Sequence, residues 1–576
     1  MPTSHLSKRG DIIQSPLKKS FAAEQLKLRK KKRTTTITIT ILVVAVIVAV
    51  IAVGYALYMH YSTKEILTET VVPTTEEIIE KKPSIAVLPF VNMSDDPEQE
   101  YFCDGMAEEI INALTNVGGL RVIARTSAFF FKGKDVKVQD VGKELNVETV
   151  LEGSVRKADN QLRITAQLIN VADESHIWSD AYNRELEDVF AIQEEISLGI
   201  VEALKVKLLE KEKAAIEKRP TENPEAWALY LQGCHFWNLR ASSQQEEMLR
   251  KGLDNFQKAV EKDSDFALAY TGIANSYHEL GYYGYMSIEE AYRKGKEAVD
   301  KALDLDDTLA EVHVSLGLIS QKIDNDFPAA GKEFKRAVEL NPNSVIAQYY
   351  YAQHLEIMGR DNDALEEFKR AQELDPLDRS YYYRIALSYL YLDRYDEAIK
   401  ECYKGIEIFP EIDGWLYYKF LELLISQRKY NEALEVVQLA RENLEDSTWG
   451  ERSLGNIYAL SGERAKVEQI LAKLQKEEYL VYIAYIYIDL GEKEKAENIL
   501  QELIEQSKKG IINPDTIAHI YAYWGELDKA MDWFEKTYEE QPDRLVRPSI
   551  RFAELCNKNI RSHPRYIALQ KKRWRE

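Results

Sequence analysis

The sequence predicts an α+β protein in three parts: one transmembrane helix, then a small α/β domain, then an all-α superhelix of paired helices. Three observations predict this organisation. An uncharged apolar run of 23 residues lies near the amino terminus, alternating strand and helix patterns follow it, and a 34-residue repeat with only helical patterns fills most of the rest. A chain of 576 residues has room for these parts, because a single hydrophobic core rarely grows beyond about 250 to 300 residues.

The apolar run spans Ile37–Met59 and contains no charged residue. As a helix it is about 35 Å long, which is enough to cross a hydrocarbon core of about 30 Å. It is longer than the apolar part of a signal peptide, and Tyr55 and Tyr58 near its end are typical of a membrane interface. We therefore expect a membrane anchor that is retained.

A basic tail, residues 1–36, precedes this anchor. Ten Lys and Arg residues against two acidic ones give the tail a charge of about +8, whereas only Lys64 in the polar linker 60–82 lies close on the other side. The positive-inside rule then predicts a single-pass protein of the inner (cytoplasmic) membrane. Its amino terminus lies in the cytoplasm and its bulk in the periplasm or otherwise outside the cytoplasm.

The rest of the chain is acidic. The net charge of −20 leaves about −28 for the residues after the tail, which argues against nucleic-acid binding. The four cysteines form no CxxC pair, so a disulfide scaffold is excluded, although the state of each cysteine stays open.

The predicted α/β domain covers residues 83–210. A continuous apolar run followed by a polar loop indicates a buried strand and then a helix, and the same order recurs once. The expected elements are strand Ser84–Phe90, helix Asp104–Val117, strand Leu120–Ala124 and helix Val136–Leu145.

A β-hairpin is the clearest local pattern in this domain. Two alternating runs flank Ala158–Asn160, with Leu162, Ile164, Ala166 and Leu168 on one face of the second run. His176–Asn183 suggests a further strand. Apolar residues spaced three or four apart from Val189 to Leu208 predict a long closing helix.

The loop NMSDDPEQEYFCDGMAEEI carries seven acidic residues around Cys103. A calcium loop of the EF-hand type does not fit, because Pro97 occupies a ligand position, and no histidine lies near enough in sequence to complete a zinc site. A capped helix start fits better, with Asp104 as the candidate cap and Glu108 and Glu109 in the first turn. Whether the loop is also a contact surface stays open.

Beyond the prolines of Lys218–Trp227 the strand patterns end and a repeat begins. Two segments align with Ala352 and Ala386, Ala364 and Ala398, and Pro376 and Pro410, each pair being 34 residues apart. Small residues at such positions let two helices approach closely, and proline ends the second helix. The pattern resembles the tetratricopeptide repeat over residues 223–542, with eight or nine units. Residues 543–576 are basic and amphipathic, as expected of a C-terminal cap.

The α/β segment also shows a resemblance. From about Pro83 to Leu204 its motifs, including PSIAVLPFVNMSDDPEQEYFCDGMAEEIINAL and VIARTSAFFFKGK, are similar to the TolB-like (FlgO-like) amino-terminal domain of bacterial membrane-anchored proteins. In that family the domain commonly precedes tetratricopeptide repeats. Relatives often carry a cytoplasmic winged-helix domain, nucleotide cyclase or kinase, for which the residues before this span are too few.

The repeats suggest a peptide-binding groove. Tyr349, Tyr383 and Tyr418 occupy the same place on the first helix of three successive units, and Tyr391 and Trp415 are expected nearby. The resemblance implies that this place faces the concave groove, where aromatic side chains favour an extended peptide. The alternative is that these side chains pack between repeats.

No nucleotide-binding, serine-hydrolase or zinc-protease motif is present, so we expect no enzyme, no cofactor and no metal site. The sequence predicts a non-catalytic, membrane-anchored scaffold that binds envelope proteins or peptides through the repeats and the TolB-like domain. The alternative is a transmembrane sensor that signals to a separate cytoplasmic partner on the basic tail. The partner's identity and the oligomeric state stay open.

Overall fold

The computed structural model describes residues 82–573, except for gaps at 95, 97–98, 159–160, 186–187, 242–243, 323, 325, 410–413, 444–446, 475–478 and 541–556. The predicted basic tail, the transmembrane helix and the linker up to residue 81 lie outside the described residues. Among the helices that are described, none is both long and apolar enough to span a bilayer.

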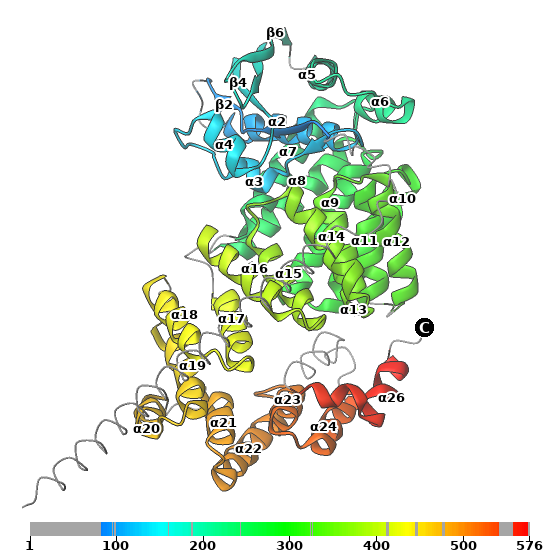
Figure 1. The fold of residues 1–576 in the computed structure, drawn as a ribbon. Coiled ribbons are helices and arrows are strands. Elements are labelled where there is room, and N and C mark those ends of the chain that lie inside the picture. Colours follow the sequence, from blue (N-terminus) through cyan, green and yellow to red (C-terminus); the bar gives the residue numbers. More distant parts are fainter. Residues whose placement is uncertain are drawn as a thin grey trace, which may run out of the picture. The chain divides into compact units, whose positions relative to one another are not determined.

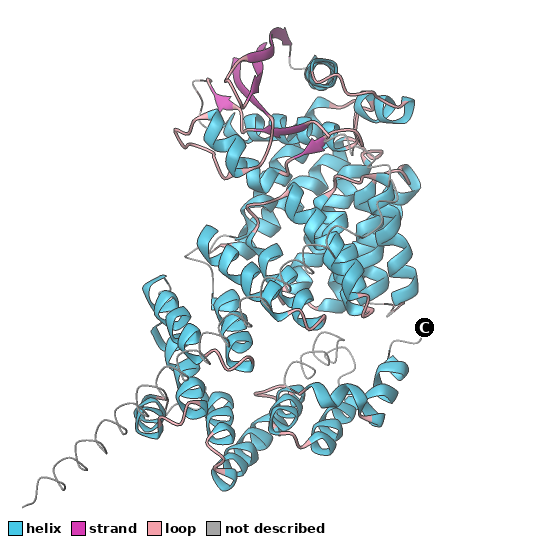
Figure 2. Ribbon diagram, in the orientation of Figure 1, coloured by secondary structure: helices cyan, strands magenta, loops and turns pink. Residues whose placement is uncertain are grey.

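The described part of the chain begins with a mixed sheet and continues as paired helices (Figures 1 and 2). The strand order is β3-β1-β4-β5-β6, and β2 pairs with β4 beside this path. β1 is parallel to β3 and β4, and β4, β5 and β6 form an antiparallel meander. The strands are β1 Ser84–Val87, β2 Val91–Asn92, β3 Arg121–Val122, β4 Thr149–Ala158, β5 Gln161–Asn170 and β6 His176–Glu185.

The predicted hairpin is confirmed as β4 and β5. Ile164 and Leu168 of β5 are fully buried while Arg163 and Gln167 are exposed, as the alternating sequence requires. The other predicted strands are found too, although β1 and β3 are shorter than expected.

Helices cover both faces of the sheet. Ile85 and Val87 of β1 face the core beneath α2 and α5, whereas Ala86 faces a smaller core with α3 and α4. The helices are α2 Glu100–Thr115, α3 Arg125–Phe129, α4 Val138–Glu144, α5 Val189–Ala203 and α6 Glu210–Glu217. The long closing helix predicted up to Leu208 ends at Ala203, and Lys205 beyond it has a φ of 55° that does not continue a helix.

The predicted start of the first helix was wrong. α2 begins at Glu100 with Gln99 in the cap position, so Asp104 lies inside the helix, where it is 5% exposed, and does not cap it. The reason is a distant partner: Lys132 Nζ lies 2.6 and 2.7 Å from the two carboxylate oxygens of Asp104 and 2.8 Å from Glu100. This ion pair stabilises a buried carboxylate that a cap would have left at the surface.

From α7 onward the described elements are helices, which pack in consecutive antiparallel pairs. They are α7 Pro224–Asn238, η3 Leu239–Ala241, α8 Gln245–Lys262, α9 Ala267–Tyr282, α10 Ile288–Leu305, α11 Ala310–Lys322, α12 Phe327–Leu340, α13 Val345–Ile357, α14 Asp361–Leu374, α15 Arg379–Tyr391, α16 Tyr395–Ile408, α17 Gly414–Ser426, α18 Tyr430–Asn443, α19 Ser447–Leu460, α20 Arg464–Lys473, α21 Leu480–Asp489, α22 Lys493–Lys508, α23 Pro514–Trp524, α24 Leu527–Glu540, η5 Lys558–Ser562 and α26 Pro564–Arg573.

Small residues set the helix spacing, as the repeat pattern predicted. A Cβ atom on Gly317 of α11 would lie 2.6 Å from the ring of Phe334 in α12. Ala330 and Ala337 of α12 are fully buried on the same side. A larger residue at these places would push the two helices apart.

The sheet and the first repeat share one hydrophobic core. Trp227 of α7 is buried with its ring edge-on to Phe102 of α2 at 5.6 Å and to Phe190 of α5 at 5.2 Å. A Cβ atom on Gly105 of α2 would lie 2.7 Å from Leu231 of α7. The change from sheet to repeats across the segment 218–223 therefore does not interrupt the core.

Two turns between later repeats also hold the α/β region. The Asn343 side-chain amide, before α13, lies within 3.0 to 3.2 Å of the carbonyl oxygens of Thr115, Val117 and Leu120 at the end of α2. Before α15, Asp375 accepts hydrogen bonds from the backbone N–H and the hydroxyl of Ser127, at 3.0 and 2.5 Å. We call these two contacts the turn contacts.

The pKa of Asp375 is raised to about 7 by burial and by nearby Asp378. The folded chain therefore holds this proton more tightly than the unfolded chain, whose aspartates titrate near 4. Stability from this group is fully present below about pH 4 and declines as the pH rises to about 7.

We predict that Asp375→Asn removes this decline, because an amide oxygen still accepts both bonds from Ser127 and carries no charge. At pH 8 the variant should be more stable than the natural chain by roughly 1 to 3 kcal/mol, and the gain should shrink towards pH 4. Urea unfolding at several pH values measures this. Asp254→Asn, at an exposed position of α8, is the control and should change little. A variant that is less stable than the natural chain at pH 8 would contradict the account.

Candidate protein-binding groove

The predicted groove tyrosines lie on the first helices of successive repeats. Tyr349 is on α13 and Tyr383 on α15, and both are half-buried at the border of the repeat core. Trp415 and Tyr418 belong to α17, but their side chains lie outside the described residues. Tyr391, which was expected to lie near the groove, is only 7% exposed and packs in the core, so it is not a groove residue.

An arginine missed at the sequence level lies between the two tyrosines. The guanidinium carbon of Arg384 is 5.9 Å from the ring centre of Tyr349 and 5.8 Å from that of Tyr383. Both distances are within the range of a cation–π contact. Tyr349 and Tyr383, which were predicted from their repeat position, thus both contact the guanidinium group of Arg384.

Arg384 also forms an ion pair. Its Nη1 lies 3.6 Å from a carboxylate oxygen of Glu356, which is 3% exposed at the side chain, whereas Arg384 is 24% exposed. Burial alone would lower the pKa of Arg384, but Glu356 and the tyrosine oxygens outweigh it and raise the pKa. The guanidinium is therefore permanently charged and held in place, with part of its surface open to a ligand.

Three aromatic side chains pack against the ring of Tyr349. Its ring meets Tyr350, Phe368 and Tyr381 edge-on, with ring centres 5.5, 6.0 and 5.8 Å away. Tyr349 therefore serves the packing between repeats and also keeps an accessible face. The packing between repeats is thus found at Tyr349, and whether its exposed side faces a groove stays a prediction.

A second contact between an arginine and an aromatic ring lies in the first repeat. Arg240, in η3, lies 3.4 Å above the ring of Trp237. Burial lowers the pKa of Arg240, against the charge of Glu279 on α9. Burial and then Glu279 raise the pKa of Tyr350, so these groups lie near one another.

Helix α2 occupies the first repeats itself. Arg125 binds Glu108 at 2.9 Å, and Asn238 at the end of α7 donates to the same carboxylate at 3.3 Å. Burial, Glu108 and then Glu311 of α11 raise the pKa of Glu109 to about 7. Glu108 and Glu109, in the middle of α2, thus face other parts of the chain. The contacts of the α/β region continue along the repeats to Asn343 before α13 and Asp375 before α15.

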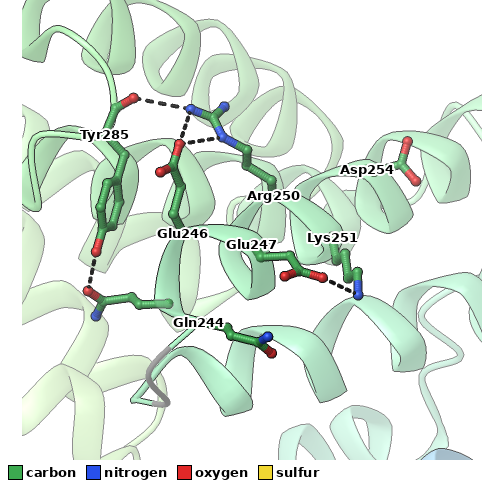
Figure 3. Close-up of a pocket in the computed structure, with 8 residues that line it drawn as sticks. Gln244, Glu246, Glu247, Arg250, Lys251, Asp254 and Tyr285 are labelled. Atoms are coloured by element: carbon green, nitrogen blue, oxygen red, sulfur yellow. Dashed lines mark hydrogen bonds and ion pairs between the residues drawn. The ribbon is translucent and has the colours of Figure 1, made fainter.

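One open recess lies elsewhere and is lined mainly by charged and polar residues (Figure 3). It has a volume of about 740 Å³ and is lined mainly by the start of α8 and by Tyr285. The Tyr285 hydroxyl donates to Gln245 at 2.8 Å, Arg250 binds Glu246 at 2.8 Å and Lys251 binds Glu247 at 2.7 Å (Figure 3). These charges satisfy one another, and the recess brings no nucleophile and base together.

The three cysteines that the structure describes are poor candidates for chemistry. Cys103, Cys234 and Cys402 are free, and burial raises the pKa of each, that of Cys103 to about 12. A neutral, buried thiol is a poor nucleophile. In the described part of the chain, no group of three or more His, Cys, Asp or Glu side chains is placed to hold a metal ion.

Comparison with known proteins identifies the repeats. Tetratricopeptide repeat models match residues 324–378, 380–412, 478–509 and 516–544. This part of the chain is built from tetratricopeptide repeats, a module of protein–protein interaction scaffolds, and the predicted repeat fold is confirmed.

One curated relative is "Putative adenylate cyclase 3" of Rhizobium meliloti (strain 1021), which is 48% identical over 176 residues. The match covers 30% of this chain and 30% of that protein, so the chain spans less than a third of its relative.

Solved structures of similar fold include PilF of Pseudomonas aeruginosa, at 16% identity over 36% of this chain and 90% of that one, with a TM-score of 0.31. YrrB, described as a TPR protein with an unusual peptide-binding site, is 25% identical over 38% of this chain and 98% of that one, with a TM-score of 0.24. Scores of this size do not establish a common arrangement of the whole chains.

Proposed function

We propose that the protein is a non-catalytic scaffold, anchored in the inner membrane, whose repeats bind an extended segment of another envelope protein. The observation that carries this proposal is the Tyr349–Arg384–Tyr383 cluster on the first helices of two successive tetratricopeptide repeats. Tyrosine and arginine are the residue types that most often dominate protein interfaces. Here they are half-buried and held in place before any partner binds.

The chemistry of the cluster narrows the kind of partner. Glu356 neutralises Arg384, so the site offers no net charge for capturing a terminal carboxylate. What it presents are aromatic faces and the outer edge of a planar cation. These groups favour a segment with aromatic or amide side chains, which stack on rings and accept hydrogen bonds from guanidinium N–H groups.

The proposal includes the membrane anchor and the division of the chain into domains. The uncharged run Ile37–Met59 and the basic tail before it support an inner-membrane span with the bulk of the protein in the periplasm. The quoted motifs and the mixed sheet support a TolB-like domain over 83–210. The helical repeat supports a repeat domain over 223–542 and a cap over 543–576.

We predict that Tyr349→Ala combined with Tyr383→Ala weakens partner capture about tenfold or more, since two truncated hot spots each cost at least about 1 kcal/mol. The measurement is quantitative crosslinked pull-down from native membranes, with circular dichroism to show that the repeats stay folded. Tyr403→Ala, which removes a 39% exposed tyrosine from the second helix of a repeat, is the matched control and should leave capture intact. Equal capture by the double variant and the natural chain would refute the groove.

We also predict the orientation. A reporter fused after Glu576 should be active only if it works outside the cytoplasm. Activity of a reporter that works only in the cytoplasm would contradict the proposed topology and would leave the groove untouched.

A further inference from the structure

Strand β6, His176–Glu185, ends the described sheet on the side away from β3. It is ten residues long, pairs with β5 along its length, and lies at the outer side of the meander (Figure 2). Tyr182 is its one buried side chain, at 7% exposure. A long, exposed edge strand offers a row of backbone groups for pairing with another strand.

The direction of these backbone groups follows from one hydrogen bond. The N–H of Ala181 donates to the side-chain oxygen Oδ1 of Asp180 at 2.7 Å, so this N–H faces the open edge and not β5. Alternate residues of a strand direct their N–H and C=O groups to the same side. Ser179 and Asn183 therefore face the open edge as well.

The charges on this strand are complementary to a copy of itself. Asp180 and Arg184 lie on the same face as Tyr182, two residues to either side of it. When two such strands run antiparallel with Tyr182 at the centre, Asp180 of each copy stands opposite Arg184 of the other. Opposite charges placed directly across a strand pair stabilise that pairing.

The same register also allows backbone hydrogen bonds between the two copies and keeps equivalent faces of the two sheets together. It places Ala181 opposite Asn183 of the second copy, and both have outward N–H and C=O groups. A two-fold axis through the centre keeps the face covered by α5 on the same side in both sheets. The overlap from Ser179 to Glu185 is seven residues, or about 24 Å.

We propose that β6 pairs antiparallel with β6 of a second copy of this chain, centred on Tyr182, and joins the two sheets into one. Asp180 then exchanges its contact with the Ala181 N–H for one with Arg184 of the second copy. Arg184 already lies on Glu195 of α5, at 2.9 Å, which holds it at the strand surface. This surface is separate from the repeat groove, and the pairing leaves that groove free.

A charge swap tests the proposal in the full chain. Two differently tagged copies of the chain are expressed together and solubilised from the membrane in detergent. One copy is isolated by its tag, and the fraction of the other copy that is isolated with it is measured. Asp180→Arg alone and Arg184→Asp alone should each lower the co-isolated fraction, with self-association weakened about tenfold, because each places like charges opposite one another twice. The double change Asp180→Arg with Arg184→Asp should restore it.

Controls separate this contact from effects on folding. Arg163→Asp removes the same charge from an exposed position of β5 and should leave co-isolation unchanged. Rescue by the double change cannot arise within one strand, since positions four apart in a strand are about 13 Å from each other.

Three results would overturn the proposal. They are a natural chain that is monomeric in membranes and in detergent, single variants that associate as well as the natural chain, and a double variant that associates no better than the single ones. Isolation of β6 crosslinked to a strand of a different protein, and not to a second copy, would overturn it too.

Discussion

The packing of α2 against both the sheet and the first repeat is the contact on which the rest of the described structure depends. Trp227 lies edge-on to Phe102 and Phe190, and such aromatic pairs contribute about 0.5 to 1.5 kcal/mol each beyond the burial of their area. Gly105 allows α2 to approach α7 closely. Without this contact the exposed face of the first repeat would have no cover on its amino-terminal side, as end repeats require.

This arrangement decides where a partner finds room. Glu108, one of the acidic residues that at first suggested chemistry, accepts a hydrogen bond from Asn238 of the first repeat. The turn contacts extend the interface to Asn343 and Asp375. The α/β region thus fills the beginning of the repeat array. These contacts reach the helices that carry the aromatic cluster around Arg384, because Asp375 lies between α14 and α15.

Patterns with a short period were predictable from the sequence. The hairpin follows from alternating residues, and the repeats follow from small residues spaced 34 apart. Contacts between distant residues were not predictable. Aspartate is a common helix cap, so its residue type made Asp104 a reasonable candidate. Its place inside the helix is explained only by its ion pair with Lys132, which lies 28 positions away in the sequence. Tyr383 was found by its repeat position, whereas Arg384 beside it occurs once and has no period; its role appears only with Glu356 and Tyr349 in place.

Amide hydrogen exchange of the full chain tests most directly whether α2 and the first repeat form one core. If they do, the buried amides of α2, near Met106 and Ile110, and those of α7, near Leu231, open with the same free energy, and Gly105→Leu lowers the protection of both helices together. Rapid exchange in α2 while α7 stays protected would contradict this, because it would show that the α/β region and the repeats fold as separate units.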